Sequence, residues 1–200
     1  MDQHQWDEAY ASTELVWTAE ANRFVVEELA DLVPGRALDL GTGEGRNAIW
    51  LAGRGWQVTA VDFSAVGLAK AAKLAEKRGV TGVQWVEADL RVYRPGPAAY
   101  DLVLMAYIHL PPEDFGALLR MAAASALVPG GTLLVVGHDV DNIAHGHGGP
   151  QDPRILHRAQ DVVAGLPGLT IHRAEQALRQ VPTSEGERVA IDTVVRAQRP

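Results

Sequence analysis

The sequence predicts an α/β fold in which a doubly wound, seven-stranded sheet is mostly parallel and carries an antiparallel C-terminal strand. Three observations support this prediction. Apolar segments of strand length alternate with helical segments between residues 37 and 140, and this alternation is typical of a parallel sheet with helices on both faces. Three closely spaced glycines follow the first such segment. Two strand-like segments joined by a short turn end the sequence, which indicates the antiparallel strand.

The N-terminal elements begin with a helix predicted over residues 12–30, which Ser12 or Thr13 can cap. The segment 32–36, LVPGR, ends this helix. We then expect three strands, over residues 37–40, 57–64 and 83–90, separated by helices over residues 46–52 and 65–79. Glycine, a frequent helix terminator, ends these helices at Gly53 and Gly79.

The C-terminal elements begin with a strand over residues 100–107 that is apolar on both faces, as expected of a central parallel strand. A helix over 112–127, a turn over 128–131 and a strand over 132–140 follow. A short helix over 159–164 then precedes strands over 169–181 and 187–198. We predict one domain over residues 1–200, with helix 12–30 as a lid and loop 139–155 beside the substrate, because a structureless loop this long usually has a function.

Composition excludes several classes of function. The chain has 200 residues, a formal charge of −7 and no cysteine, so disulfides, thiolate metal sites and cysteine nucleophiles are excluded. The basic residues are scattered, whereas binding of nucleic acid phosphates needs clustered cations. No apolar run approaches the ~18 residues of a membrane span, and no secretory signal precedes the first helix. We expect a cytoplasmic monomer or homodimer that binds a small molecule and neither nucleic acid nor membrane.

The segment ALDLGTGEGRNAIWLA, residues 37–52, carries the first functional signal. Alternate glycines at 41, 43 and 45 let the backbone approach a ligand, and the following helix directs N–H groups toward it. The spacing is G-x-G-x-G, and Arg46 stands where the dinucleotide fingerprint G-x-G-x-x-G has its last glycine. Glu44 would repel a pyrophosphate. These residues favour a cationic, phosphate-free ligand such as S-adenosylmethionine over a nicotinamide dinucleotide.

Acidic residues end three successive predicted strands, at Asp39, Asp62 and Asp89. A carboxylate after the second strand can accept hydrogen bonds from both ribose hydroxyls, and one after the third can accept from the adenine amino group. Each acid has a structural alternative: Asp62 could cap the next helix, although Ser64 could do so equally well, and Asp89 could be a turn residue. Three such acids together favour a nucleoside site.

With these motifs the chain resembles class I S-adenosylmethionine-dependent methyltransferases, which have a Rossmann-like fold. The resemblance rests on LDLGTGEGRNAIWLA, VTAVDFS, VEADL, YDLVLMAYIHL and LVPGGTLLVV. With WDEAY near the N-terminus, it is most similar to the small bacterial subgroup of tellurite-resistance and thiopurine methyltransferases. Thr42 stands where many relatives have cysteine.

The resemblance implies a cofactor site ordered along the strand ends. Asp39 and the backbone of residues 41–43 would hold the methionine end, and residues 105–107 would lie beside it. Asp62 would bind the ribose, and residues 88–90 would frame the adenine. The full predicted set is Trp17, Asp39, Gly41, Thr42, Gly43, Arg46, Asn47, Asp62, Phe63, Ser64, Ala88, Asp89, Leu90, Met105 and Tyr107. Trp6, Tyr10 and Trp17 could form an aromatic lid.

Histidines supply the candidate catalytic groups. Transfer from a sulfonium is an in-line displacement that depends mainly on orientation, but a hydroxyl acceptor also needs a base. His138 ends the fifth predicted strand and is the best-placed candidate, and His145 in the long loop is the second; His109 and His147 are weaker candidates. His138, Asp139, Asp141 and Asn142 could bind a divalent metal, but alternating loop acids are usually solvated and we predict no metal site.

The predicted function is methyl transfer from S-adenosylmethionine to an oxygen, sulfur or metalloid nucleophile of a small molecule. The segment at residues 105–108 is MAYI, not the Asn/Asp-Pro-Pro-aromatic motif of enzymes that methylate amino groups of adenine or glutamine. Two alternatives remain open at this point: a nicotinamide-dependent oxidoreductase and a protein that binds the cofactor without catalysis.

Overall fold

The computed structural model describes residues 3–12, 15, 18–184 and 186–200. The helices are α1 (Gln3–Ser12), α2 (Arg23–Leu29), α3 (Arg46–Ala52), α4 (Ala65–Lys77), α5 (Pro112–Met121), α6 (Asn142–His145) and α7 (Ala159–Ala164), with a π-helical turn η1 (Ala122–Ala126) and a 3₁₀ turn η2 (Pro153–Ile155). The strands are β1 (Arg36–Leu40), β2 (Gln57–Asp62), β3 (Val83–Glu87), β4 (Tyr100–Ala106), β5 (Leu127–His138), β6 (Thr170–Thr183) and β7 (Gly186–Gln198).

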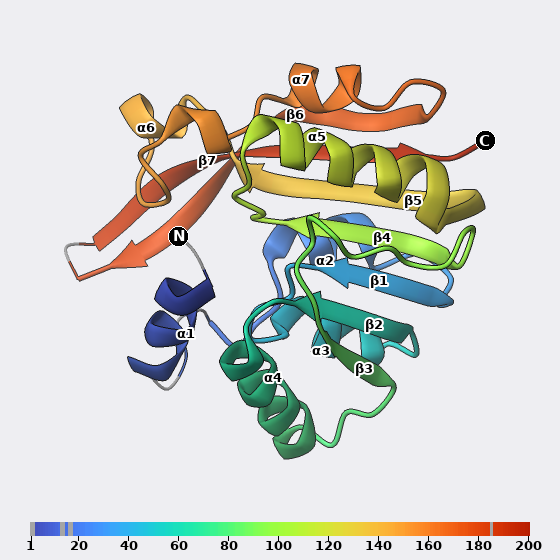
Figure 1. The fold of residues 1–200 in the computed structure, drawn as a ribbon. Helices are drawn as coiled ribbons and strands as arrows, with labels where there is room; N and C mark the ends of the chain where they lie inside the picture. The colour runs from blue at the N-terminus through green and yellow to red at the C-terminus, as the bar shows by residue number, and fades with distance from the viewer. Residues whose placement is uncertain (1–2, 13–14, 16–17, 185) are drawn as a thin grey trace.

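The strands form one sheet in the order β3-β2-β1-β4-β5-β7-β6 (Figure 1). Strands β1 to β5 are parallel, whereas β7 pairs antiparallel with both β5 and β6. The predicted fold class is therefore confirmed. The strand order reverses between β1 and β4, and such sheets bind ligands at the carboxyl ends of the strands next to the reversal.

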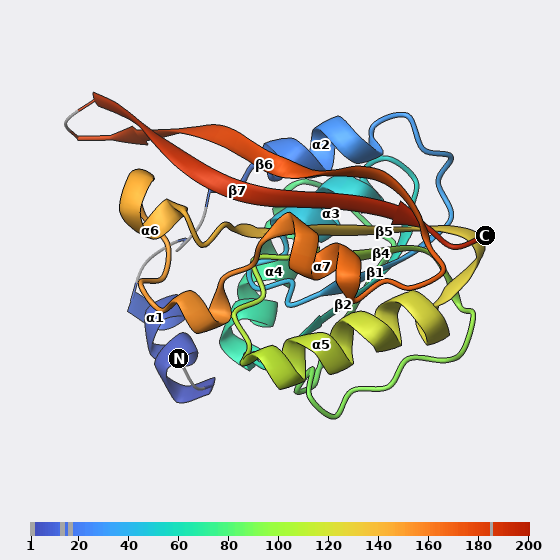
Figure 2. The ribbon, with the colours of Figure 1, turned by 90° about the horizontal axis from the view of Figure 1, so that it is seen from above.

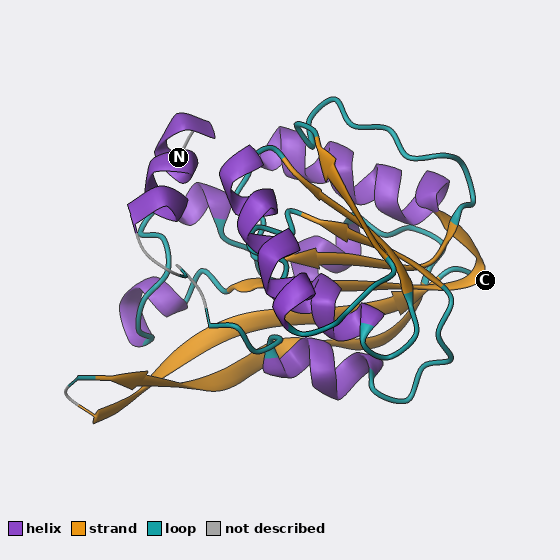
Figure 3. Cartoon of the chain, turned by 90° about the horizontal axis from the view of Figure 1, so that it is seen from below, coloured by secondary structure: helices purple, strands orange, loops and turns teal. Residues whose placement is uncertain are grey.

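Two hydrophobic layers cover the sheet because side chains alternate between the faces of each strand. On β4, Leu102 and Leu104 pack with α2 and α3, whereas Val103 and Met105 pack with α5 and α7. Figure 2 shows these helix pairs on opposite sides of the sheet. The distal half of the β6–β7 hairpin extends past the rest of the sheet (Figure 3). The extended hairpin thus adds a wall beyond the carboxyl ends of the parallel strands.

The predicted helix over residues 12–30 was wrong. Helix α1 ends at Ser12, residues 18–22 are not helical, and α2 begins at Arg23; residues 13, 14, 16 and 17 lie outside the described part of the chain. The physical reason is Asn22, whose side chain accepts hydrogen bonds from the backbone N–H groups of Phe24 and Val25 and so caps a new helix. The element nearest the N-terminus is a separate short helix.

Smaller differences affect the C-terminal half. The predicted helix over 112–127 ends as α5 at Met121 and continues as a π-helical turn. The turn at 128–131 lies within β5, where the pairing with β4 changes register. Loop 139–155 contains α6 and η2. Within the described residues, no helix has the length and apolar character needed to cross a membrane.

Candidate functional site

A cavity of about 1000 Å³ opens at the carboxyl ends of β1, β2 and β4. Its volume lies at the upper end of the range for small-molecule sites, on the order of 300–1,000 Å³. The wall combines the glycine segment, helix α1, the ends of β4 and β5, loop 139–155 and the β6–β7 hairpin. The residues on it that bear on function are Trp6, Tyr10, Asn22, Gly41, Thr42, Gly43, Glu44, Arg46, Asn47, Asp62, Phe63, Asp89, Leu90, Tyr107, His109, His138, His147, Gly149 and Arg179.

The glycine segment needs its glycines for conformation and for packing. Gly41, Gly43 and Gly45 have φ angles of 70°, 54° and 76°, values that other residues rarely adopt. A Cβ atom at Gly45 would also lie 2.7 Å from Ala71 and 2.8 Å from Trp85. The first two glycines therefore open the cavity wall, and Gly45 lets the start of α3 pack against α4 and the sheet.

Asp39 supports this segment from below. It is 1% exposed and lies outside the set of cavity-lining residues, and its Oδ2 accepts a 2.7 Å hydrogen bond from the Thr42 hydroxyl. Burial raises the pKa of Asp39 to about 7. The structure thus places Asp39 beneath the glycine segment, which it supports through Thr42.

Asp62 lies on the cavity wall at the end of β2. Its Oδ2 accepts from the Gly43 N–H at 2.8 Å and its Oδ1 accepts from the Ser64 N–H at 2.9 Å. Burial raises its pKa, although these backbone donors oppose the shift. Ser64 itself caps α4 by accepting from the Gly67 N–H, so Asp62 is not the helix cap. Ser64 lies outside the cavity wall and donates a hydrogen bond to Asp7 of α1.

The end of the cavity beside β3 contains most of the residues predicted to surround adenine. Phe63, Asp89 and Leu90 line it, whereas Ala88 and Met105 do not. Arg91 donates from Nε and Nη2 to the carboxylate of Asp89 at distances from 2.5 to 3.0 Å, which lowers the pKa of Asp89. A ligand at this end would meet a carboxylate already oriented by its neighbour.

Helix α1 covers part of this end. Trp6 and Tyr10 line the cavity with their rings stacked, the centroids 5.5 Å apart. Tyr10 packs against Gly67, where a Cβ atom would lie 3.1 Å from the tyrosine ring. The third aromatic residue of the predicted lid, Trp17, lies outside the described residues. Two of the three aromatic residues thus come from helix α1, which sequence analysis did not predict.

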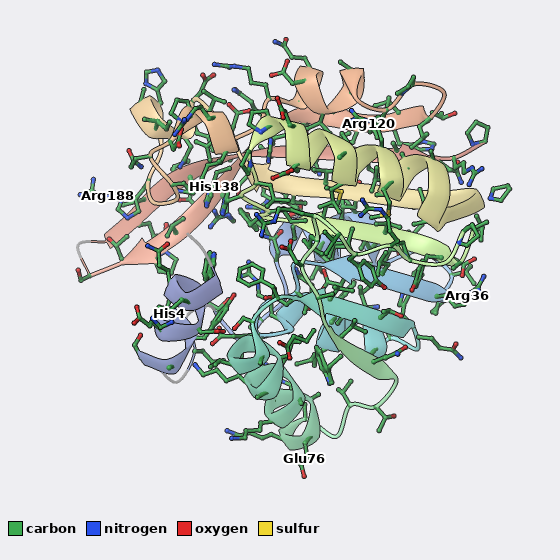
Figure 4. All side chains as sticks on the ribbon, in the orientation of Figure 1. His4, Arg36, Glu76, Arg120, His138 and Arg188 are labelled. Atoms are coloured by element: carbon green, nitrogen blue, oxygen red, sulfur yellow. The ribbon has the colours of Figure 1, made fainter. Side chains whose placement is uncertain are left out.

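The opposite end of the cavity contains His138 and a buried carboxylate. The β5–β7 register places His138 directly opposite Asp192, and His138 Nδ1 lies 3.2 Å from Asp192 Oδ1. Figure 4 shows His138 at the edge of the sheet from which the hairpin continues toward Arg188. Asp192 is fully buried; burial alone would raise its pKa, but contacts with His138 and Arg179 lower the pKa below its usual range.

The other histidines differ in their positions. His109 lines the cavity and its ring stacks parallel to that of His138, with centroids 5.9 Å apart. Burial lowers the pKa of His109 to about 4, so its imidazole is neutral at pH 7. His147 lies on the cavity wall, whereas His145 is exposed on α6 and lies outside it. The geometry therefore favours His138 over His145 as a base.

The loop acids considered as metal ligands have structural partners. Asp139 accepts from Thr193 and Gln176, and Asp141 pairs with Arg158 at 2.9 Å. Asn142 donates to Gly148 O and accepts from the Ile191 N–H. Among the described residues, no group of three or more His, Asp or Glu side chains is arranged to hold a metal ion. These side chains order the loop instead.

Sequence analysis missed three residues of the histidine end: Asn22, Arg179 and Asp192. Asp192 had a usable signal, because it is a single acid within the apolar strand VAIDTVV, and a buried carboxylate needs a partner. Asn22 had the weaker signal of a cap residue before an apolar helix. Arg179 had no signal, since its position opposite Ala190 in the hairpin depends on strand register.

Comparison with known proteins finds a methyltransferase domain in the chain. Residues 37–131 match the family model described as "Methyltransferase domain". The chain is 35% identical over 118 residues to ribosomal RNA small subunit methyltransferase C of Chromohalobacter salexigens, and 31% identical over 113 residues to the protein of the same name from Alcanivorax borkumensis. This chain therefore contains a methyltransferase domain. The matches cover 55% and 52% of the chain but only 33% of each relative.

Solved structures share the methyltransferase fold at low sequence identity. The chain is similar to a protein described for conversion of a disulfide bond into a thioacetal group during echinomycin biosynthesis, with a TM-score of 0.76 and 22% identity over 98% of this chain and 92% of the other. TehB from Haemophilus influenzae is similar with a TM-score of 0.74 and 18% identity, over 97% of this chain and 67% of TehB. The N-methyltransferase NodS from Bradyrhizobium japonicum, in complex with S-adenosyl-L-homocysteine, is similar with a TM-score of 0.72 and 16% identity over 100% of both chains. These likenesses concern the fold.

Proposed function

We propose that this methyltransferase transfers a methyl group from S-adenosylmethionine to an oxygen or sulfur nucleophile of a small molecule, with a metalloid nucleophile as a variant of the same reaction. One observation carries this proposal: a single cavity has the carboxylate of Asp62 on the wall at one end and His138, 3.2 Å from a buried carboxylate, at the other. The first end suits an adenosyl group, and the second suits an acceptor that must lose a proton.

The residues of the first end fit the cofactor. Asp62 would accept hydrogen bonds from the ribose hydroxyls, and its two backbone partners already orient it. Phe63, Asp89 and Leu90 would surround the adenine. Gly41 and Gly43 leave room for the methionine portion beside Arg46, whose guanidinium could bind a carboxylate. The bound cofactor would supply an electrophilic methyl group on a sulfonium.

His138 would act as the general base. His138 Nδ1 lies 3.2 Å from Asp192 Oδ1, and an imidazole that carries its proton on Nδ1 would present the Nε2 lone pair to the acceptor. Gly149 of the loop approaches this edge, since a Cβ atom at Gly149 would lie 2.8 Å from Nε2. Loop 139–155 therefore contributes to our proposed acceptor site through residues such as His147 and Gly149.

The two alternative functions left open by the sequence, an oxidoreductase and a non-catalytic binding protein, are less well supported. A nicotinamide dinucleotide would place its pyrophosphate against Glu44, which pairs with Lys70 at 3.2 Å, and would need a small residue where Arg46 stands. A protein that binds the cofactor without catalysis would not need the buried His138–Asp192 pair. The formal charge of −7 disfavours RNA as the acceptor, although the curated relatives are named as ribosomal RNA methyltransferases.

Calorimetry with S-adenosylmethionine, S-adenosylhomocysteine and NAD tests the cofactor. We expect the first two ligands to bind and NAD not to bind; binding of NAD alone would refute the proposal. A panel of phenols, thiols, sugars, tellurite and a ribosomal RNA fragment, followed by release of S-adenosylhomocysteine, then tests the acceptor. Turnover with RNA and with none of the small molecules would overturn the acceptor class.

A further inference from the structure

We infer that Tyr107 is a positioning residue that holds Asp192, and through it His138, in the orientation that the base requires. This role rests on the proposed function of His138. Tyr107 immediately follows β4 and its side chain is largely buried at the histidine end of the cavity. Sequence analysis predicted that Tyr107 lies beside the cofactor; in the structure it lines the cavity and its hydroxyl group contacts Asp192.

The Tyr107 hydroxyl group joins two buried polar residues. It donates a 2.9 Å hydrogen bond to Asp192 Oδ2 and accepts a 3.0 Å hydrogen bond from Asn22 Nδ2. The Asn22 N–H in turn donates to Asn47 Oδ1 at 2.9 Å, and Asn47 lies in the first turn of α3. A continuous chain of contacts therefore runs from the first turn of α3 to the carboxylate next to His138.

The two oxygens of Asp192 have different partners. Oδ2 accepts from the Tyr107 hydroxyl at 2.9 Å and from Arg179 Nε at 2.6 Å. Oδ1 faces His138 Nδ1 at 3.2 Å and Arg179 Nη2 at 3.3 Å. Because a carboxylate is planar, fixing Oδ2 with two donors fixes the direction of Oδ1. Without the tyrosine donor, the carboxylate can rotate toward Arg179 and away from the imidazole.

The backbone of Tyr107 adopts an unfavourable conformation, which the surrounding structure must stabilise. Its φ angle is 56°, a left-handed conformation that is rare for a large aromatic residue. The Tyr107 N–H donates to Val136 O at 2.7 Å, and the ring lies 4.9 Å from that of His138. This strained conformation turns the hydroxyl group toward Asp192 instead of leaving the side chain along the strand direction.

Nuclear magnetic resonance of ¹⁵N-labelled histidine tests this role without knowledge of the acceptor. In the wild-type chain with S-adenosylhomocysteine, His138 should be mainly the Nδ1–H tautomer. The substitution Tyr107→Phe keeps the ring and removes only the hydroxyl group. It should lower the ratio of Nδ1–H to Nε2–H tautomers about fivefold, in keeping with the loss of one hydrogen bond. An unchanged ratio in a folded variant would overturn the inference.

Two further variants keep the test decisive. Tyr100→Phe removes a tyrosine hydroxyl at the opposite end of β4 and should leave the tautomer ratio unchanged. Asn22→Ser retains a good helix cap but removes the donor to Tyr107, so it should lower the ratio less than Tyr107→Phe does. If neither Tyr107→Phe nor Asn22→Ser changes the ratio, Tyr107 does not position His138. Calorimetric binding of S-adenosylhomocysteine tests the proposed function separately, because Tyr107→Phe should not abolish it.

Discussion

The two ends of the cavity are built in different ways. The end with Asp62 is local: its carboxylate and its main partners, Gly43 and Ser64, come from consecutive strand ends within about one β-α-β unit. The end with His138 is assembled from Asn22, Tyr107, His138, Arg179 and Asp192, which lie on α2, β4, β5, β6 and β7 or at their ends. The first end is recognisable as a motif, whereas the second exists only in the folded sheet.

This difference separates a site that short motifs can encode from one that only the folded sheet assembles. A cofactor site can be encoded by short motifs because β-α turns place adjacent strand ends together. An acceptor site must suit one substrate, and our proposed acceptor site uses the antiparallel hairpin that is added to the sheet. Substitutions at the two ends should therefore have different effects. Those at the Asp62 end should weaken cofactor binding, and those at the His138 end should lower turnover alone.

The largest expected effect tests the histidine end. His138→Ala should lower turnover about 10²–10⁴-fold, the usual contribution of a general base, while the calorimetric affinity for S-adenosylhomocysteine stays unchanged. The matched control is His145→Ala, because His145 is exposed on α6 and outside the cavity; its turnover should equal that of the wild type. Equal turnover of both variants would remove His138 as the base.

The next effect tests the packing of the glycine segment. Gly45→Val should lower the free energy of unfolding by about 2–4 kcal/mol, because it combines a clash in the core with an unfavourable backbone conformation. At Gly45, φ is 76° and a Cβ would meet Ala71 and Trp85. Gly79→Ala isolates the backbone contribution, since φ there is 64° with no atom near the added Cβ. Urea denaturation that gives equal losses for both variants would contradict the packing argument.

A third effect tests the Asp62 end. Asp62→Ala removes the proposed ribose acceptor and the acceptor for two backbone N–H groups. The affinity for S-adenosylhomocysteine should fall about 10–100-fold, as expected for hydrogen bonds to a charged group. The control is Asp101→Ala, which should retain wild-type affinity. Asp101 lies at the amino end of β4, far from the cavity, and its Oδ2 accepts from the Arg36 N–H. Retained affinity in Asp62→Ala would disprove the ribose role.

A fourth effect is the pH dependence of stability that arises from Asp39. Burial raises the pKa of Asp39 to about 7, from 3.8 in the unfolded chain. The folded chain therefore holds a proton that the unfolded chain has released, so stability decreases as the pH rises from about 4 to about 7. Asp39→Asn should remove this decrease, by on the order of 1 kcal/mol per pH unit at most. Unfolding measured between pH 5 and 8, with the exposed Asp31→Asn as control, checks the slope.

Sequence analysis placed most of the sheet correctly because local patterns determine these elements. Helices α3 and α7 match their predicted limits, and strand β1 differs by one residue. The N-terminal helix was wrong because an asparagine side chain outweighs a continuous apolar pattern: Asn22 caps α2 and separates it from α1. Sequence analysis could not tell that Asp39 lies outside the cavity wall, because a strand-end acid cannot be assigned to the wall or to the underside without the loop conformation.

The sequence by itself determined the fold class, the strand ends that face a ligand and the G-x-G-x-G segment, because each depends on residues close together in the chain. The tertiary structure decided that His138 faces Asp192, that Tyr107 and Arg179 bind the same carboxylate, and that His145 lies outside the cavity. These contacts depend on strand order and antiparallel register, which bring together residues up to 85 positions apart.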